Sequence, residues 1–118
     1  MPFDPTNPSK QIVLASVEPV MFPGTGHGDT IDTTGFRFLL FGVNVPGGAL
    51  PIPPAGSTIE VDGLGPDTLW NWQMIPPFGI GAVGFTLLRA FQPITDHVRV
   101  AWTMVGAGGF GYWLIGQS

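Results

Sequence analysis

Proline and glycine interrupt every apolar run of this chain, and that feature constrains its fold more than any other. The 118 residues include 18 Gly and 13 Pro, together more than a quarter of the chain. Such a composition can indicate disorder, but 44% of the residues are hydrophobic and only 10% are charged, the reverse of a disordered chain. Short apolar stretches between turns are typical of an all-β protein. We therefore predict a single β-sandwich or jelly-roll-like domain of seven to eight strands.

The clearest strand covers residues 97–105, near the C-terminus. Its even-numbered positions are apolar, whereas its odd-numbered positions are mixed, which is the period of a strand with one buried face. A glycine-rich segment at 106–109 follows, and then a second apolar run at 110–115. Two apolar runs joined by a short glycine turn predict a β-hairpin.

Two further strands have distinct patterns. Residues 36–43 are apolar on both faces apart from Arg37, which predicts a strand with one face in the core and the other in an interface. Residues 11–17 form another strand, which Glu18 and Pro19 interrupt, and a strand next to proline belongs at a sheet edge. The boundaries we predict are an extended arm and edge strand over residues 1–20 and the sandwich domain over 21–118.

A tryptophan-containing segment at 68–74 also alternates. Trp70 and Trp72 share one side, which we predict to face the core. Pro76-Pro77 is expected to end this strand, and Asp62-Gly63 before it is a turn signal.

The charge composition argues against several classes of function. Only four residues are cationic and the net charge is −4, so we expect no nucleic-acid binding. No signal peptide or membrane span is expected from the sequence. The absence of cysteine leaves neither disulfides nor thiolate metal ligands. So little charge predicts that another protein chain covers much of the surface.

No motif predicts catalysis, a cofactor or a metal. Residues 79–84 match G-x-G-x-x-G, but β-prone residues follow them where a dinucleotide site needs a helix. His27, Asp29 and Asp32 lack the ligand spacing of a zinc or calcium site. Asp96-His97 are adjacent, and adjacent strand residues point to opposite faces. We expect a binding protein and not an enzyme.

Aromatic side chains leave two interpretations open. Trp113 falls on the face opposite to Phe110 and Tyr112, where it can reach a neighbouring protein or stack on a sugar. Tryptophan and tyrosine are enriched in protein interfaces, so we favour a protein partner and keep carbohydrate as the alternative.

The chain resembles small β-sandwich virion proteins of tailed bacteriophages, of the head decoration or minor capsid type. The likeness lies in Thr34–Phe41, in Asp62-Gly63 followed by Trp70, and in Thr95–Val100 with its glycine turn and final apolar strand at 110–118. It covers residues 30–118. The proline-rich loop at 46–56 and the glycine-rich loop at 79–84 depart from the usual pattern.

The resemblance implies a capsid decoration or cement protein that binds the head surface through protein–protein contacts. It implies that the partners are the major capsid protein and further copies of the chain as a homotrimer, assembled in the host cytoplasm and located on the virion. It brings no catalytic residues, cofactor or metal. The alternative is a tail- or fibre-associated module that binds host-surface carbohydrate. The residues expected in the interface are Phe3, Ile12, Leu14, Phe36, Phe38, Phe41, Phe110, Tyr112 and Trp113.

Overall fold

A computed structural model describes residues 11–87 and 91–117, and they form an all-β fold with no helix. The predicted arm at residues 1–10, with Phe3, lies outside the described residues. Among residues 11–87 and 91–117, no helix is long and apolar enough to cross a membrane. The strands are β1 (Gln11–Phe22), β2 (Gly26–His27), β3 (Ile31–Asp32), β4 (Phe38–Val45), β5 (Thr58–Gly63), β6 (Trp72–Gly79), β7 (Gly84–Leu87), β8 (His97–Thr103) and β9 (Gly108–Gln117).

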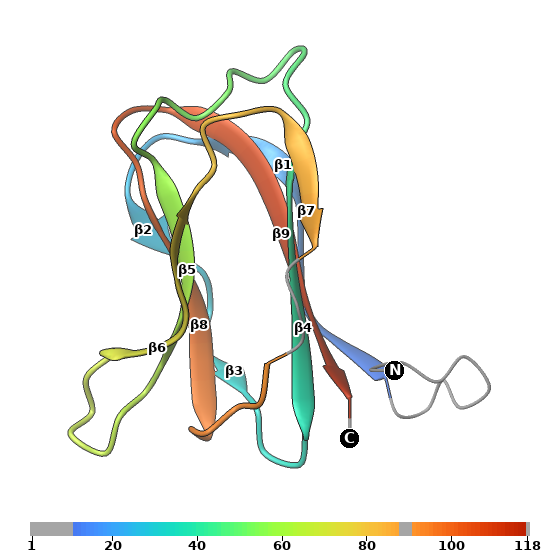
Figure 1. Cartoon of the computed structure of the whole chain (residues 1–118), viewed down its shortest axis with the longest axis vertical. Helices are drawn as coiled ribbons and strands as arrows, with labels where there is room; N and C mark the ends of the chain where they lie inside the picture. The colour runs from blue at the N-terminus through green and yellow to red at the C-terminus, as the bar shows by residue number, and fades with distance from the viewer. Residues whose placement is uncertain (1–10, 88–90, 118) are drawn as a thin grey trace.

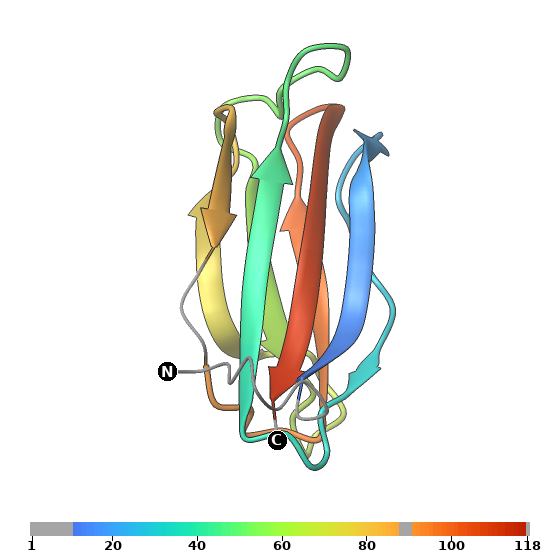
Figure 2. The same cartoon turned by 90° about the vertical axis from the view of Figure 1, so that its right-hand side faces the viewer.

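Two antiparallel sheets face one another across the core, so the predicted β-sandwich is confirmed (Figures 1 and 2). The first sheet has the order β1-β9-β4-β7, and the second has β2-β8-β5-β6 with β3 also paired to β8. Strands β2 and β3 have two residues each, and both pair with β8. Together they form one interrupted edge strand beside seven longer strands, which agrees with the predicted number.

The chain crosses between the sheets at most of its connections, and this overturns the predicted hairpin. Strand β8 pairs with β5 in the second sheet, whereas β9 pairs with β1 and β4 in the first. The segment at 104–107 therefore joins the two sheets, and β8 and β9 meet face to face. Among the described strands, only β5 and β6 are consecutive long strands that pair with each other.

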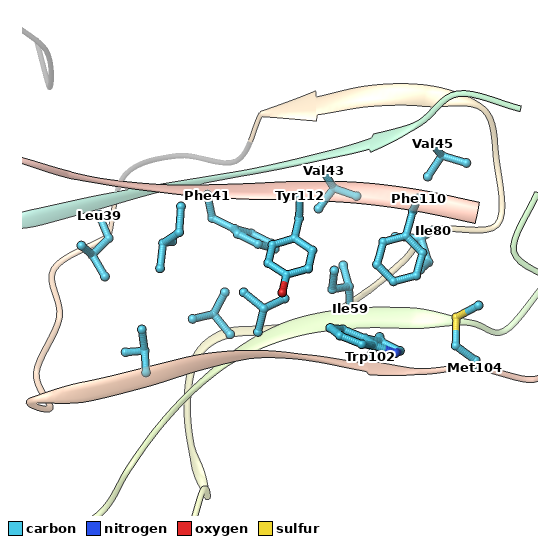
Figure 3. Close-up of a cluster of buried hydrophobic side chains, with 14 residues drawn as sticks. Leu39, Phe41, Val43, Val45, Ile59, Ile80, Trp102, Met104, Phe110 and Tyr112 are labelled. Atoms are coloured by element: carbon cyan, nitrogen blue, oxygen red, sulfur yellow. The ribbon is translucent and has the colours of Figure 1, made fainter. Parts of the chain in front are cut away.

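Side chains from the inner faces of both sheets fill the space between them (Figure 3). Phe110 stacks on Phe22 with ring centroids 4.2 Å apart and meets Trp102 edge-on at 5.7 Å. The Trp102 indole N–H donates to the Gly24 carbonyl oxygen at 3.1 Å, so its polar atom is satisfied inside the core. The fully buried members are Leu39, Phe41, Ile59, Val61, Val98, Phe110 and Leu114.

The two edge strands with prolines differ from their predicted extents. Strand β1 continues through Pro19 because a register shift between Val17 and Val20 accommodates the interruption. It forms an edge of the first sheet, as predicted. Strand β6 does not end at Pro76-Pro77 but contains both residues. It is the outer strand of the second sheet, where a residue without an N–H group is tolerated.

The tryptophan-containing segment also corrects a prediction. Strand β6 begins only at Trp72, whose side chain is 41% exposed instead of buried in the core. Trp70 precedes the strand and covers Arg99, with the guanidinium carbon 4.6 Å from the ring centroid. Asp62-Gly63 lies within β5 and pairs with β8, so the turn begins after it.

Candidate interaction surface

Strand β1 forms a long apolar edge of the first sheet. Its outer side has no partner strand among the described residues, and four of its large hydrophobic side chains are 45–61% exposed. An unpaired apolar edge of this length is a template for another strand. Glu18 and Pro19 interrupt β1 after Val17, which leaves Gln11–Val17 as the uncharged segment, and this segment contains one register shift, between Val13 and Ala15. The exposed side chains are Ile12, Val13, Val20 and Met21.

Three cross-strand rows form the outer face of the same sheet. Each row takes one residue from β1, one from β9 and one from β4, and none of these residues is charged. Residues that pair across antiparallel strands share a face, so the rows form one continuous surface. Uncharged, partly apolar surfaces of this kind mark protein interaction sites. The rows are Gln11, Gln117 and Phe38; Val13, Ile115 and Leu40; and Ser16, Trp113 and Gly42.

Trp113 packs on its own sheet. Its six-membered ring lies over Gly42, so that a Cβ atom at position 42 would overlap it. Trp113 is half-buried, and a shallow pocket of about 280 Å³ beside it is lined by Glu18, Pro19 and Asn44, among others. Trp113 is therefore on the outer face, as predicted, but β4 covers part of its indole.

The expected interface residues divide between the surface and the core. Ile12 and Phe38 are exposed on the first sheet, at 49% and 39%. Leu14 and Phe36 are partly buried and pack against the core. Three other residues that were expected in the interface lie between the two sheets, where they cannot contact a partner protein, so this expectation is wrong for them. These residues are Phe41, Phe110 and Tyr112, with exposed fractions of 0%, 0% and 5%.

A cleft of about 450 Å³ lies where β1 and the interrupted edge strand approach each other. Leu14 and Val17 line one side, Asp29 and Asp32 line the other, and Tyr112 also contributes. Burial raises the pKa of the Tyr112 hydroxyl above its usual range, and the negative charge of Asp29 raises it further. A backbone hydrogen bond from Thr34, 2.9 Å long, lowers the pKa of Asp32.

The outer face of the second sheet is polar, in contrast to that of the first. Asp62 on β5 lies directly opposite Arg99 on β8, and Trp70 covers the guanidinium. Asp62 Oδ1 and Arg99 Nε are buried without a hydrogen-bond partner among the described residues. Burial, with the adjacent Glu60, raises the pKa of Asp62 to about 7, although Arg99 opposes the shift. From the sequence, strand alternation is enough to place Asp62 and Arg99 on outer faces. That they lie opposite each other depends on β5 and β8 being neighbours, which the sequence does not show.

The motifs considered for chemistry are dispersed over the second sheet and the connections beside it. His27 pairs with Ala101 on one part of β8, and Asp32 pairs with His97 on another. The described residues contain no group of three or more His, Cys, Asp or Glu side chains that could hold a metal ion. The glycine-rich segment at 79–84 joins β6 to β7 and leads into a strand.

No protein-family model matches the chain, and no curated protein matches it either.

Proposed function

We propose that this chain is a structural subunit that binds other protein chains through its first sheet. The observation that carries the proposal is the coincidence of an unpaired apolar edge strand, β1, with three rows on the outer face of the same sheet that contain no charged residue. The one cation beside these rows is Arg37, whose guanidinium carbon lies 5.7 Å from the Phe38 ring centroid among the described residues. A second chain that pairs with Gln11–Val17 and packs on the three rows would cover both the edge of β1 and the outer face of the sheet. The proposed function is binding alone, and it includes no chemical step.

Strand addition explains how a chain with so few charges can bind specifically. Main-chain hydrogen bonds supply affinity along an edge, and alternate side chains supply selectivity. On β1 the side chain of Val13 lies in the same row as Ile115 and Leu40, so an added strand would extend an apolar row. Burying apolar surface contributes about 25 cal/mol per Å². Leu40 is only 8% exposed in the free chain, so this contribution would come from Val13, which is 61% exposed, and from the half-buried Ile115.

The partner that we propose is a capsid surface together with further copies of the chain as a homotrimer. This part of the proposal rests on the resemblance to virion decoration proteins, and it places the chain on the virion. A subunit that cements a shell needs a stable fold and a broad, neutral contact surface. The sandwich supplies the first and the outer face of the first sheet supplies the second.

Charge substitution on the edge strand tests the proposal. Val13→Lys places a charge in the middle row, while the exposed side chain leaves the core unchanged. We expect the concentration for half-saturation of capsid shells assembled without this chain to rise about ten- to a hundredfold in co-sedimentation. Light scattering after size-exclusion chromatography should show fewer trimers. Val105→Lys is the matched control, because Val105 is 68% exposed in the connection between β8 and β9.

Two outcomes would contradict the proposal. If Val13→Lys and Val105→Lys both bind shells and self-associate as the unsubstituted chain does, the first sheet is not the contact surface. If the folded, unsubstituted chain binds no shell at all, the capsid is not its partner.

A further inference from the structure

A pocket of about 320 Å³ opens at the end of the second sheet, beside the loop that joins β5 to β6. This volume falls within the range of small-molecule sites, about 300–1,000 Å³. The pocket is separate from the first sheet and its proposed partners. Its lining combines apolar and hydrogen-bonding side chains, and consists of Leu64, Gly65, Pro66, Trp72, Ile94, Thr95, Asp96 and His97.

The loop at 64–71 is held in place by its own hydrogen bonds. Both carboxylate oxygens of Asp67 accept, one from the Leu69 backbone N–H at 3.1 Å and the other from the Asn71 side chain at 3.2 Å. The Leu64 N–H donates to the carbonyl oxygen of His97 at 3.0 Å, which ties the loop to β8. A ligand would therefore meet a wall that is already ordered, and binding would cost little conformational entropy.

Trp72 supplies an aromatic platform at this pocket. It is 41% exposed and lines the pocket, so part of its indole is open to a ligand there. Gly65 lets the loop approach the ring, because a Cβ atom there would lie 3.0 Å from the indole nitrogen of Trp72 and 2.8 Å from Asp67 Oδ1. Ile94, 66% exposed, adds a second apolar contact to the lining.

Hydrogen-bonding groups complete the lining and indicate the charge of the ligand. Asp96 precedes β8, so strand alternation does not separate it from His97, contrary to the expectation from sequence, and both residues line the pocket. The exposed Asp96 side chain accepts hydrogen bonds, and the half-buried His97 ring can accept or donate them. Asp32 pairs opposite His97, and Asp67 belongs to the loop, so the surroundings are acidic. Arg99, two residues further along β8, lies beneath Trp70. This distribution disfavours phosphates and carboxylates.

We propose that this pocket binds one neutral sugar residue, with an apolar sugar face stacked on Trp72 and its hydroxyl groups hydrogen-bonded to Asp96 and His97. A sugar ring offers carbon–hydrogen bonds on one face and hydroxyl groups around its edge, and the pocket provides a partner for each. The site differs from the expected one at Trp113 and does not depend on how the first sheet assembles.

Titration of the isotope-labelled full chain by nuclear magnetic resonance tests the site. The probes are methyl glycosides of glucose, galactose, mannose and N-acetylglucosamine, with galacturonate as the anionic comparison. We expect at least one neutral glycoside to shift the Trp72 indole signal saturably at millimolar concentration, and galacturonate to bind more weakly. Trp72→Ala should weaken binding about tenfold or more, judged from the signals of Asp96 and His97. Trp72→Phe should retain part of the affinity.

The control variant is Leu69→Ala, which removes an exposed side chain from the same loop outside the pocket lining and should leave binding unchanged. Three results would overturn the proposal. These are the absence of a saturable shift with every neutral glycoside, equal affinity in Trp72→Ala and the unsubstituted chain, and Trp72 shifts that follow protein concentration without sugar. The last result would identify a second copy of the chain as the occupant of the pocket.

Discussion

Asp62 is the most unusual residue of the sandwich. Its side chain is only 6% exposed, yet one carboxyl oxygen has no hydrogen-bond partner among the described residues. Arg99 lies directly across the strand pair without satisfying that oxygen. Its guanidinium carbon is 4.6 Å from the Trp70 ring centroid, and its own Nε is also buried without a hydrogen-bond partner among the described residues. An ionised carboxylate in these surroundings is costly, so burial favours the protonated acid. Near neutral pH the side chain is close to its midpoint of ionisation.

Asp62 therefore makes the stability of the fold depend on pH. Because the ordinary pKa of Asp is 3.8 and that of Asp62 in the fold is about 7, folding takes up a proton between these values. The contribution of Asp62 to the free energy of unfolding is highest below about pH 4, falls as the pH rises to about 7, and then stays low. We expect Asp62→Asn to flatten this slope and to raise stability at pH 8 by roughly 1–2 kcal/mol. Urea denaturation across this pH range measures both effects.

The control for this prediction is Asp96→Asn, which neutralises an exposed carboxylate next to β8 and should leave the slope in place. An Asp62→Asn variant with the same pH slope as the unsubstituted chain would show that Asp62 titrates normally in the fold.

The connection between β8 and β9 shows what strand patterns can and cannot predict. Both strands bury their even-numbered residues, and this was readable from the alternation of Val98, Val100 and Trp102. The same alternation suits a hairpin, in which neighbouring strands share a face, and an arch, in which the two faces meet across the core. The choice depends on the strands that compete for each edge: β5 occupies one side of β8, and β1 and β4 flank β9.

The same limit explains which parts of the candidate sites were predictable. The fold class followed from short apolar runs between turns, and the edge position of β1 followed from Pro19. A period of two identifies two faces without showing which face another sheet covers or how far along the strands the cover reaches. Trp72 lies in one row with Gly63 and the buried Val98, but at the end of the second sheet, where it is 41% exposed. Phe41, Phe110 and Tyr112 were assigned to an interface for the same reason, although the opposite sheet buries them. The pairing of Asp62 with Arg99 joins residues 37 positions apart in sequence.

A disulfide can test the pairing of β5 with β8, because the chain has no native cysteine. Thr58 and Thr103 are paired neighbours on the outer face of the second sheet. The double variant Thr58→Cys/Thr103→Cys should form an intramolecular disulfide under mild oxidation, detected by mass spectrometry. Ser16→Cys/Thr103→Cys is the control and should remain reduced, since Ser16 lies on the outer face of the other sheet. No bond in the first variant would contradict the pairing of β5 with β8.

The whole molecule has two unlike outer faces. The three rows of the first sheet carry no charge, whereas the outer side of the second sheet includes Glu60, Asp62 and Arg99. A subunit with this asymmetry has an obvious orientation on a surface: the neutral face toward the partner and the polar face toward water. In the proposed assembly, the sugar pocket at the end of the second sheet would lie away from the neutral face of the first sheet.

Removal of the predicted arm tests the assembly at this scale. A chain without residues 1–10 should keep its melting temperature within about 2 °C, because residues 11–87 and 91–117 supply both sheets and the cluster of buried side chains between them. Its binding to capsid shells should weaken about tenfold if the arm lies along a neighbour. Calorimetry and co-sedimentation measure the two quantities. Unchanged saturation of shells by the truncated chain would rule out the contribution of the arm.

The antiparallel pairing of Gln11 with Gln117 has a practical consequence for work with this protein. It brings both ends of the described chain to one corner of the sandwich (Figure 1). A fluorescent protein or display peptide joined directly to Gln117, or to Gln11 in a chain without residues 1–10, would therefore stand beside β1 and crowd the surface that we expect partners to use. The connection between β4 and β5 lies at the opposite end of the molecule, and its Gly48-Ala49 step is exposed. Cargo inserted there would be carried clear of both the first sheet and the Trp72 pocket.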